Sequence, residues 1–188
     1  QRHPLATVVS PANLVSLSRL LLSPLLFWEV LEAEESIGTS WLAVLLGFIL
    51  AASDILDGHL ARIRGTVSTS DAVIDPLADK VVVIGTAFCL VEVERFNFLP
   101  VVLLTLREIF ITFYRLLMAR KGLSIPARKS AKWKTTVQGI ALMIAVMPFL
   151  ESSQWFVDFG LWVALIFTVV TGIQYLKDGL LATSTTGE

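Results

Sequence analysis

Cysteine, histidine and charged residues are scarce in this chain of 188 residues. It has one cysteine, Cys89, two histidines, and only 16% charged residues, whereas soluble domains contain roughly 25%. A single cysteine excludes an internal disulfide framework, and we expect Cys89 to pack as a small apolar residue in a helix. The net charge of −1 gives no indication of nucleic-acid binding, and no such partner is predicted.

Apolar residues make up 55% of the chain and occur in long runs. At about 20 residues per crossing, six candidate membrane spans can be placed, at residues 14–31, 39–58, 72–93, 98–119, 135–150 and 155–176. The sequence therefore predicts an all-α, multi-pass membrane protein with a single domain over residues 1–188. The Thr- and Ser-rich tail, about 182–188, is expected to be disordered.

The distribution of cations predicts the orientation of these spans. The connections between spans 2 and 3 and between spans 4 and 5 are rich in Lys and Arg. The charged residues of the 1–2 connection are all acidic, and the 3–4 connection holds a single cation, Arg95. Because cytoplasmic loops carry the excess of cations, both termini and the two basic connections are expected on the cytoplasmic side.

Acidic residues at this same end are the strongest functional signal. Carboxylates at the centre of a membrane helix cost roughly 2.5 kcal/mol or more each, so they normally mark a function. Four aspartates have helical spacing, namely Asp54, Asp57, Asp75 and Asp79. Gly58 and Ala61 fall near the face of Asp54, and the later pair shares a face at i, i+4. Two antiparallel helix ends meeting at the cytoplasmic surface would bring all four carboxylates together.

Such a group of carboxylates predicts a metal site. Carboxylates this close cannot all remain ionised unless cations lie between them. Oxygen ligands without His or Cys favour a hard divalent ion, Mg²⁺ or Mn²⁺. Four carboxylates suffice for two ions bridging a diphosphate, an arrangement used for displacement at phosphorus. Gly58 and Ala61 leave the backbone open to a flat group such as a nucleobase.

The aspartate segment resembles the motif D-x-x-D-G-x-x-A-R-x8-G-x3-D-x3-D of the CDP-alcohol phosphotransferases. Members of this family are six-helix membrane enzymes, usually homodimers, that transfer a group from a CDP-linked donor to an alcohol and release CMP. The resemblance implies two metal ions held by Asp54, Asp57, Asp75 and Asp79. It implies that Asp79 is also the general base. The positions expected to border the nucleotide are Asp57, Gly58, Ala61, Arg62 and Asp71.

Asp71 departs from the family pattern, which has glycine at this position. The glycine is thought to leave room for the cytidine, so an acid adds bulk and negative charge near a diphosphate. The alternative is local, because Ser68 and Asp71 have the spacing of a helix capping box. Both interpretations remain open, and the first allows a catalytically silent homologue.

Two further segments indicate the acceptor, and both resemble elements of the bacterial phosphatidylglycerophosphate synthases. Their residues are Arg107, Glu108, Arg115, Lys132, Lys134, Thr135, Thr136 and Gln138. The resemblance implies CDP-diacylglycerol as donor, sn-glycerol 3-phosphate as acceptor, and a bacterial plasma membrane. A cluster of Arg107, Arg115, Lys132 and Lys134 would compensate the charge of a phosphate dianion. We expect Glu108 to brace Arg107 or Arg115.

Other functions stay open at this point. Cardiolipin synthase and the inositol-phosphate-using enzymes of the same family also take anionic acceptors. From another class, a divalent-cation or proton transporter would use the acids as a relay. Such transporters commonly contain inverted repeats, and no repeat is visible in this sequence.

Overall fold

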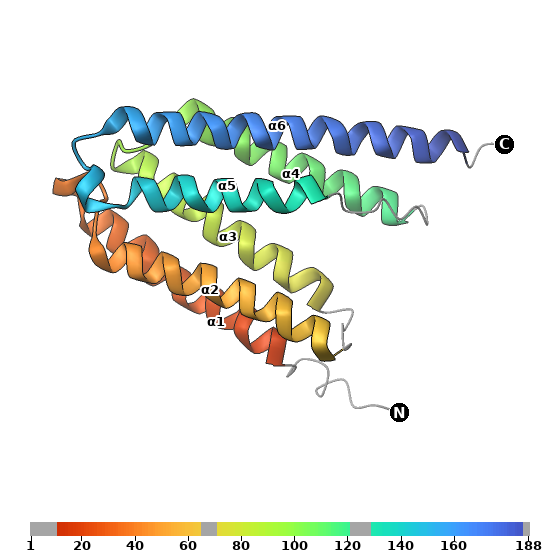
Figure 1. Cartoon of the computed structure of the whole chain (residues 1–188), viewed down its shortest axis with the longest axis horizontal. Helices are drawn as coiled ribbons and strands as arrows, with labels where there is room; N and C mark the ends of the chain where they lie inside the picture. Colours follow the sequence, from red (N-terminus) through yellow and green to blue (C-terminus); the bar gives the residue numbers. More distant parts are fainter. Residues whose placement is uncertain (1–10, 65–70, 121–128, 186–188) are drawn as a thin grey trace.

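A computed structural model describes residues 11–64, 71–120 and 129–185, with side chains for 18–53, 80–118, 120 and 133–180. Within these ranges the chain forms α-helices and no strand, which confirms the all-α prediction (Figure 1). The α-helices are α1 (Pro11–Glu32), α2 (Trp41–Arg64), α3 (Asp71–Glu92), α4 (Phe98–Arg120), α5 (Lys129–Ala145) and α6 (Gln154–Thr185). Two short 3-10 turns, η2 (Glu34–Ser36) and η3 (Pro148–Leu150), lie in connections.

Each candidate span corresponds to one helix, and the bounds differ where polar residues continue a helix beyond its apolar run. α2 continues to Arg64, and α5 already begins at Lys129, because Lys and Arg are good helix formers despite their polarity. α5 ends before Pro148, and Met147 has the extended backbone (ψ 116°) that a following proline favours. α6 reaches Thr185 and so continues into the tail for which the sequence predicts disorder.

Consecutive helices run in opposite directions. Figure 1 shows the end of α2 and the start of α3 at the same end of the molecule as the end of α4. α1 packs against α2 and α3, α6 packs against α4 and α5, and α3 contacts both α4 and α5. α3 therefore joins the two groups of helices, and the aspartate segment lies at the end where the basic 4–5 connection begins.

The apolar core lies at the opposite end of the bundle. Val30, Leu90 and Val157 are fully buried there. Two glycines allow the close approach of α1 and α3. Gly85 faces the ring of Phe27 so closely that a Cβ could not be placed, and Gly38, in the α1–α2 connection, has a φ of +73°.

Arg95 fixes the connections at this end. The side chain is completely buried. Its Nε donates to the carbonyl of Ala145 at 3.1 Å, Nη1 to that of Glu151 at 2.8 Å, and Nη2 to that of Leu150 at 2.7 Å. Gln154 Nε2 donates back to the Arg95 carbonyl at 2.9 Å. The isolated cation of the 3–4 connection thus holds the α5–α6 connection in place.

Large apolar side chains also cover much of the outer surface. On α4 alone, Leu103, Leu106, Phe110 and Phe113 are exposed. Soluble monomers rarely expose contiguous apolar surface on this scale. Among the described residues one stretch, Gln154–Leu180 of α6, is long and apolar enough to cross a membrane by itself.

Candidate active site

The backbone of the aspartate segment is helical on both sides of the 2–3 connection. Asp54 and Asp57 lie on the last turns of α2, together with Gly58, Ala61 and Arg62. Asp75 and Asp79 lie on the first turns of α3, at i, i+4. The end of α2 and the start of α3 lie at the same end of the molecule (Figure 1). The side chains of all these residues lie outside the described ones, so their convergence around metal ions stays a prediction.

Asp71 is the first residue of α3. This position agrees with a role in starting the helix, one of the two interpretations left open by the sequence. Ser68 and the side chain of Asp71 lie outside the described part of the chain.

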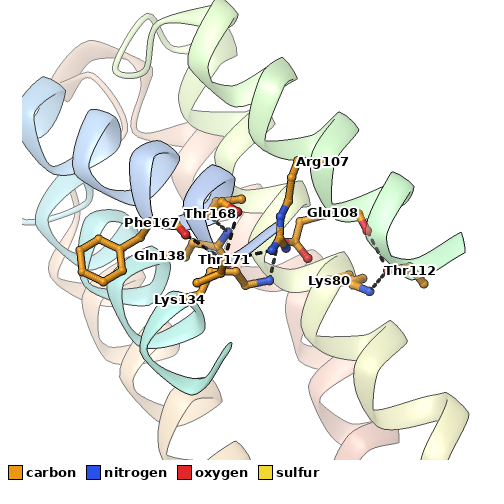
Figure 2. Close-up of polar contacts among 9 residues, drawn as sticks. All are labelled: Lys80, Arg107, Glu108, Thr112, Lys134, Gln138, Phe167, Thr168 and Thr171. Carbon is orange, nitrogen blue, oxygen red and sulfur yellow. Dashed lines mark hydrogen bonds and ion pairs between the residues drawn. The ribbon is translucent and has the colours of Figure 1, made fainter. Parts of the chain in front are cut away.

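A second group of polar side chains lies where α3, α4, α5 and α6 face one another (Figure 2). Hydrogen bonds connect its members, which we call the Glu108 cluster: Lys80, Arg107, Glu108, Thr112, Lys134, Gln138, Thr168 and Thr171. Buried polar groups require such partners. A connected network of this size among apolar helices indicates a functional site, because apolar residues would pack the same helices at lower cost.

Glu108 is the centre of the cluster and is only 5% exposed. Its Oε1 accepts a hydrogen bond from Arg107 Nη1 at 3.0 Å and another from Lys134 Nζ. A carboxylate buried in an apolar environment is stable only when paired in this way. The predicted brace between Glu108 and Arg107 is therefore confirmed. It also brings together two of the four cations predicted for the acceptor site.

α6 holds the other side of Arg107. Arg107 Nη2 donates to Thr171 Oγ1 at 3.0 Å, and Gln138 Nε2 donates to Thr168 Oγ1 at 2.9 Å. Sequence reasoning missed both threonines. The available signal was their spacing of three residues in a span that is otherwise apolar, which places them on one helix face.

Lys80 connects the cluster with the aspartate segment. It follows Asp79 directly on α3, and its Nζ donates to Thr112 Oγ1. Thr112 Oγ1 in turn donates to the Glu108 carbonyl at 2.7 Å. The residue next to the predicted general base thus reaches the cluster that contains Arg107 and Lys134. The sequence pattern alone did not indicate a role for Lys80.

The other two predicted acceptor cations are placed differently. Arg115 lies two turns beyond Arg107 on α4, where its guanidinium stands over the ring of Tyr175, 5.9 Å from the centroid. The described contacts do not connect Arg115 with Glu108. Lys132 lies on α5, one residue before Trp133, and its side chain is outside the described ones.

A cavity of about 330 Å³ lies between α1, α2, α3 and α5. Apolar side chains such as Leu50 and Met143 line most of it, and Arg19 contributes a charge. The lining also includes Ala51, three residues before Asp54, and Thr135, next to Lys134. The cavity therefore begins close to both predicted parts of the active site.

A known protein family matches most of the chain. The family described as CDP-alcohol phosphatidyltransferase matches residues 9–173. The chain belongs to this family. This match confirms the resemblance inferred from the aspartate motif. The matched residues also include those of the Glu108 cluster.

Several curated relatives have similar length. A Bacillus subtilis (strain 168) protein named CDP-diacylglycerol--glycerol-3-phosphate 3-phosphatidyltransferase is 35% identical over 178 residues, covering 88% of this chain and 92% of the relative. A Rickettsia typhi protein of the same name is 29% identical over 173 residues, covering 88% and 94%. A probable phosphatidylglycerophosphate synthase of Mycobacterium tuberculosis is 31% identical over 179 residues, covering 93% and 84%.

Proposed function

We propose that the chain transfers the phosphatidyl group of CDP-diacylglycerol to sn-glycerol 3-phosphate and releases CMP. One observation carries the choice of acceptor. Two cationic side chains, Arg107 and Lys134, converge on the single carboxylate of Glu108, and Lys80, next to the residue predicted to activate the acceptor, reaches the same cluster through Thr112. The names of relatives that align over most of the chain support the same reaction.

The charge of the Glu108 cluster suits a phosphomonoester. Glu108 neutralises one of the two cations that it binds, so Arg107 and Lys134 together keep a net positive charge, which favours an anionic group such as a phosphate. Arg107 can bind phosphate oxygens through a fork of N–H donors, and the lysines add point charges. A neutral alcohol would not require this compensation. We therefore assign Arg107 and Lys134 to the acceptor phosphate, and keep Lys132 and Arg115 as predicted contributors.

The donor side of the site is assigned to the aspartate segment. Its oxygen-only ligand set fits Mg²⁺ or Mn²⁺, and the helical backbone of α2 and α3 gives each aspartate pair the spacing of one helix face. Asp54, Asp57, Asp75 and Asp79 would hold two ions, which when bound would neutralise charge on the donor diphosphate. The nucleotide would be bordered by Asp57, Gly58, Ala61, Arg62 and Asp71.

In the proposed reaction Asp79 accepts the proton of the primary hydroxyl of the acceptor. The hydroxyl oxygen forms a bond to the phosphorus that carries diacylglycerol. The bond between this phosphorus and the oxygen that bridges to the CMP phosphate breaks, and CMP leaves with the bridging oxygen and its electron pair. Arg107 and Lys134 hold the acceptor phosphate so that its hydroxyl end points toward α3.

The donor is a lipid, and the rest of the molecule suits a membrane location. We propose six membrane spans, a homodimer in a bacterial plasma membrane, and an active site and termini on the cytoplasmic side. The exposed apolar side chains of α4 and α6 support lipid contact. The cavity beside Ala51 and Thr135 has a volume within the usual range of ligand sites, and we assign it to an acyl chain of the donor.

Measurement of CMP release from CDP-diacylglycerol by the detergent-solubilised protein tests the proposal. The acceptors to compare are glycerol 3-phosphate, glycerol, inositol phosphate and phosphatidylglycerol, with Mg²⁺, with Mn²⁺ and with a chelator. We expect release with glycerol 3-phosphate that depends on the metal. Release with phosphatidylglycerol or inositol phosphate in its place would assign another reaction of the family. Metal uptake into vesicles without any CMP release would support a transporter.

A further inference from the structure

We propose that Thr171 and Gly172 of α6 position Arg107 for the acceptor phosphate and thereby determine the affinity for glycerol 3-phosphate. We call these two residues the α6 seat. The inference rests on the proposed function, because it assigns a role to α6 in the acceptor site formed by α3, α4 and α5. The aspartate motif and the acceptor segments recognised in the sequence all precede α6.

Thr171 fixes one edge of the guanidinium. Its hydroxyl accepts from Arg107 Nη2 at 3.0 Å. The same hydroxyl has its single proton directed to the helix backbone, where the carbonyls of Phe167 and Thr168 lie at 2.8 and 3.0 Å. Because that proton is engaged, the oxygen is available to Arg107 only as an acceptor. The hydrogen bond therefore has a defined direction and holds the guanidinium plane against α6.

Gly172 provides the space in which Arg107 lies. A Cβ at this position would be 2.8 Å from Arg107 Nε and 3.4 Å from Nη2. The first distance is shorter than carbon–nitrogen contacts allow, so the arginine would have to move. It cannot do so freely, because Nη1 is bound to Glu108 and Nη2 to Thr171. Glycine within a helix reduces stability relative to alanine. The close contact with Arg107 explains why glycine nevertheless occupies position 172.

The seat leaves part of the guanidinium available to a ligand. Arg107 Nε is buried against Gly172 and has no hydrogen-bond partner among the described residues. Glu108 and Thr171 each take one N–H from a terminal nitrogen. Arginine has two N–H groups on each terminal nitrogen, so one remains on each. Two such donors form the fork that binds two oxygens of a phosphate.

A further contact holds α6 in a fixed position relative to Lys134, the second cation assigned to the acceptor phosphate. Gln138 of α5 donates to Thr168 Oγ1 at 2.9 Å in a fully buried contact. Gln138 lies one helical turn beyond Lys134, and Thr168 lies one turn before Thr171. This contact fixes the α6 seat relative to Lys134, so Arg107 and Lys134 keep the separation at which both reach Glu108.

Gly172→Ala tests the inference, with Gly160→Ala as matched control. Both substitutions add one methyl group to α6, but a Cβ at Gly160 would meet Ala141 at an ordinary 3.8 Å. We expect Gly172→Ala to raise the KM for glycerol 3-phosphate about tenfold, while the KM for CDP-diacylglycerol stays within about twofold. Gly160→Ala should change neither KM. An unchanged KM for glycerol 3-phosphate in Gly172→Ala, or an equal rise for both substrates, would overturn the inference.

Thr171 provides a second test that introduces no steric clash. Thr171→Val removes the hydroxyl at nearly constant volume, and Thr171→Ser retains it. We expect valine to raise the KM for glycerol 3-phosphate several-fold and serine to restore it. Equal effects of valine and serine would contradict the inference, even if Gly172→Ala failed to fold. Failure of the proposed function is distinguishable, because the wild-type protein would then release no CMP with glycerol 3-phosphate.

Discussion

Arg107 of α4 and Lys134 of α5 donate hydrogen bonds to the same oxygen, Oε1 of Glu108. Two cations from different helices are thus held side by side by one buried carboxylate. Without that carboxylate they would repel each other in an environment of low dielectric constant. Glu108 consequently has a structural role that also prepares a site for an anion.

Glu108→Gln should destabilise the protein. The substitution retains the shape of the side chain but leaves Arg107 and Lys134 without a counter-charge, and removal of one partner of a buried ion pair costs about 3 kcal/mol or more. The measurement is thermal unfolding in detergent, with Glu92→Gln as control because Glu92 is an exposed acid of α3. A melting temperature equal to that of the control would show that Glu108 does not stabilise the pair.

Arg95→Met should lower stability without affecting catalysis. It removes hydrogen bonds to the carbonyls of Ala145, Leu150 and Glu151, and unsatisfied buried carbonyls should lower the free energy of unfolding by about 3 kcal/mol. Since these contacts lie at the end of the bundle opposite the aspartate segment, both KM values should stay unchanged. Arg120→Met, at an exposed position on α4, is the control. A selective rise in the KM for either substrate would contradict this assignment.

Asp79→Asn should abolish turnover while leaving donor binding largely intact. Asparagine cannot accept the hydroxyl proton, and loss of a general base typically reduces the rate at least about 100-fold. CMP release and equilibrium binding of CDP-diacylglycerol, measured on the same preparation, separate the two effects. A variant with a nearly normal rate would require a different base.

Asp71→Gly restores the family pattern and should increase activity. Removal of an acid near the donor diphosphate should raise kcat/KM for CDP-diacylglycerol at least about threefold. Asp71→Asn separates charge from bulk, because it removes the charge and retains the side-chain volume. An unchanged kcat/KM combined with a lower melting temperature would instead favour the helix-starting role suggested by the position of Asp71 at the beginning of α3.

The sequence predicted the helices and part of the site because both depend on local patterns. Long apolar runs defined six helices, and the spacing of Asp54 and Asp57, or of Asp75 and Asp79, required only that their segments be helical. The pairing of Glu108 with its neighbour Arg107 was predictable for the same reason. The start of α5 and the end of α6 were less predictable, because polar residues continue these helices beyond the apolar runs. α5 also ends at Ala145, before the predicted residue 150, because Pro148 follows it.

The remaining contacts depend on tertiary packing. Lys80 could not be assigned, since its partner Thr112 lies on another helix. Gly172 is one glycine among eleven in the sequence. Its role becomes visible only because the Arg107 side chain packs directly against it. The sequence suggested only that Arg95 is a cation of a connection. Its role comes from hydrogen bonds to three carbonyls that lie 50 to 56 residues further along the chain.

Arg107 and Lys134 are the side chains that we propose to hold the acceptor phosphate. The most direct measurement is kcat/KM for glycerol 3-phosphate in Lys134→Met, with the KM for CDP-diacylglycerol measured in parallel. We predict that kcat/KM for glycerol 3-phosphate falls at least about 100-fold, while the KM for CDP-diacylglycerol changes little. An unchanged kcat/KM, or equal rates with glycerol 3-phosphate and neutral glycerol in the wild-type protein, would contradict the claim.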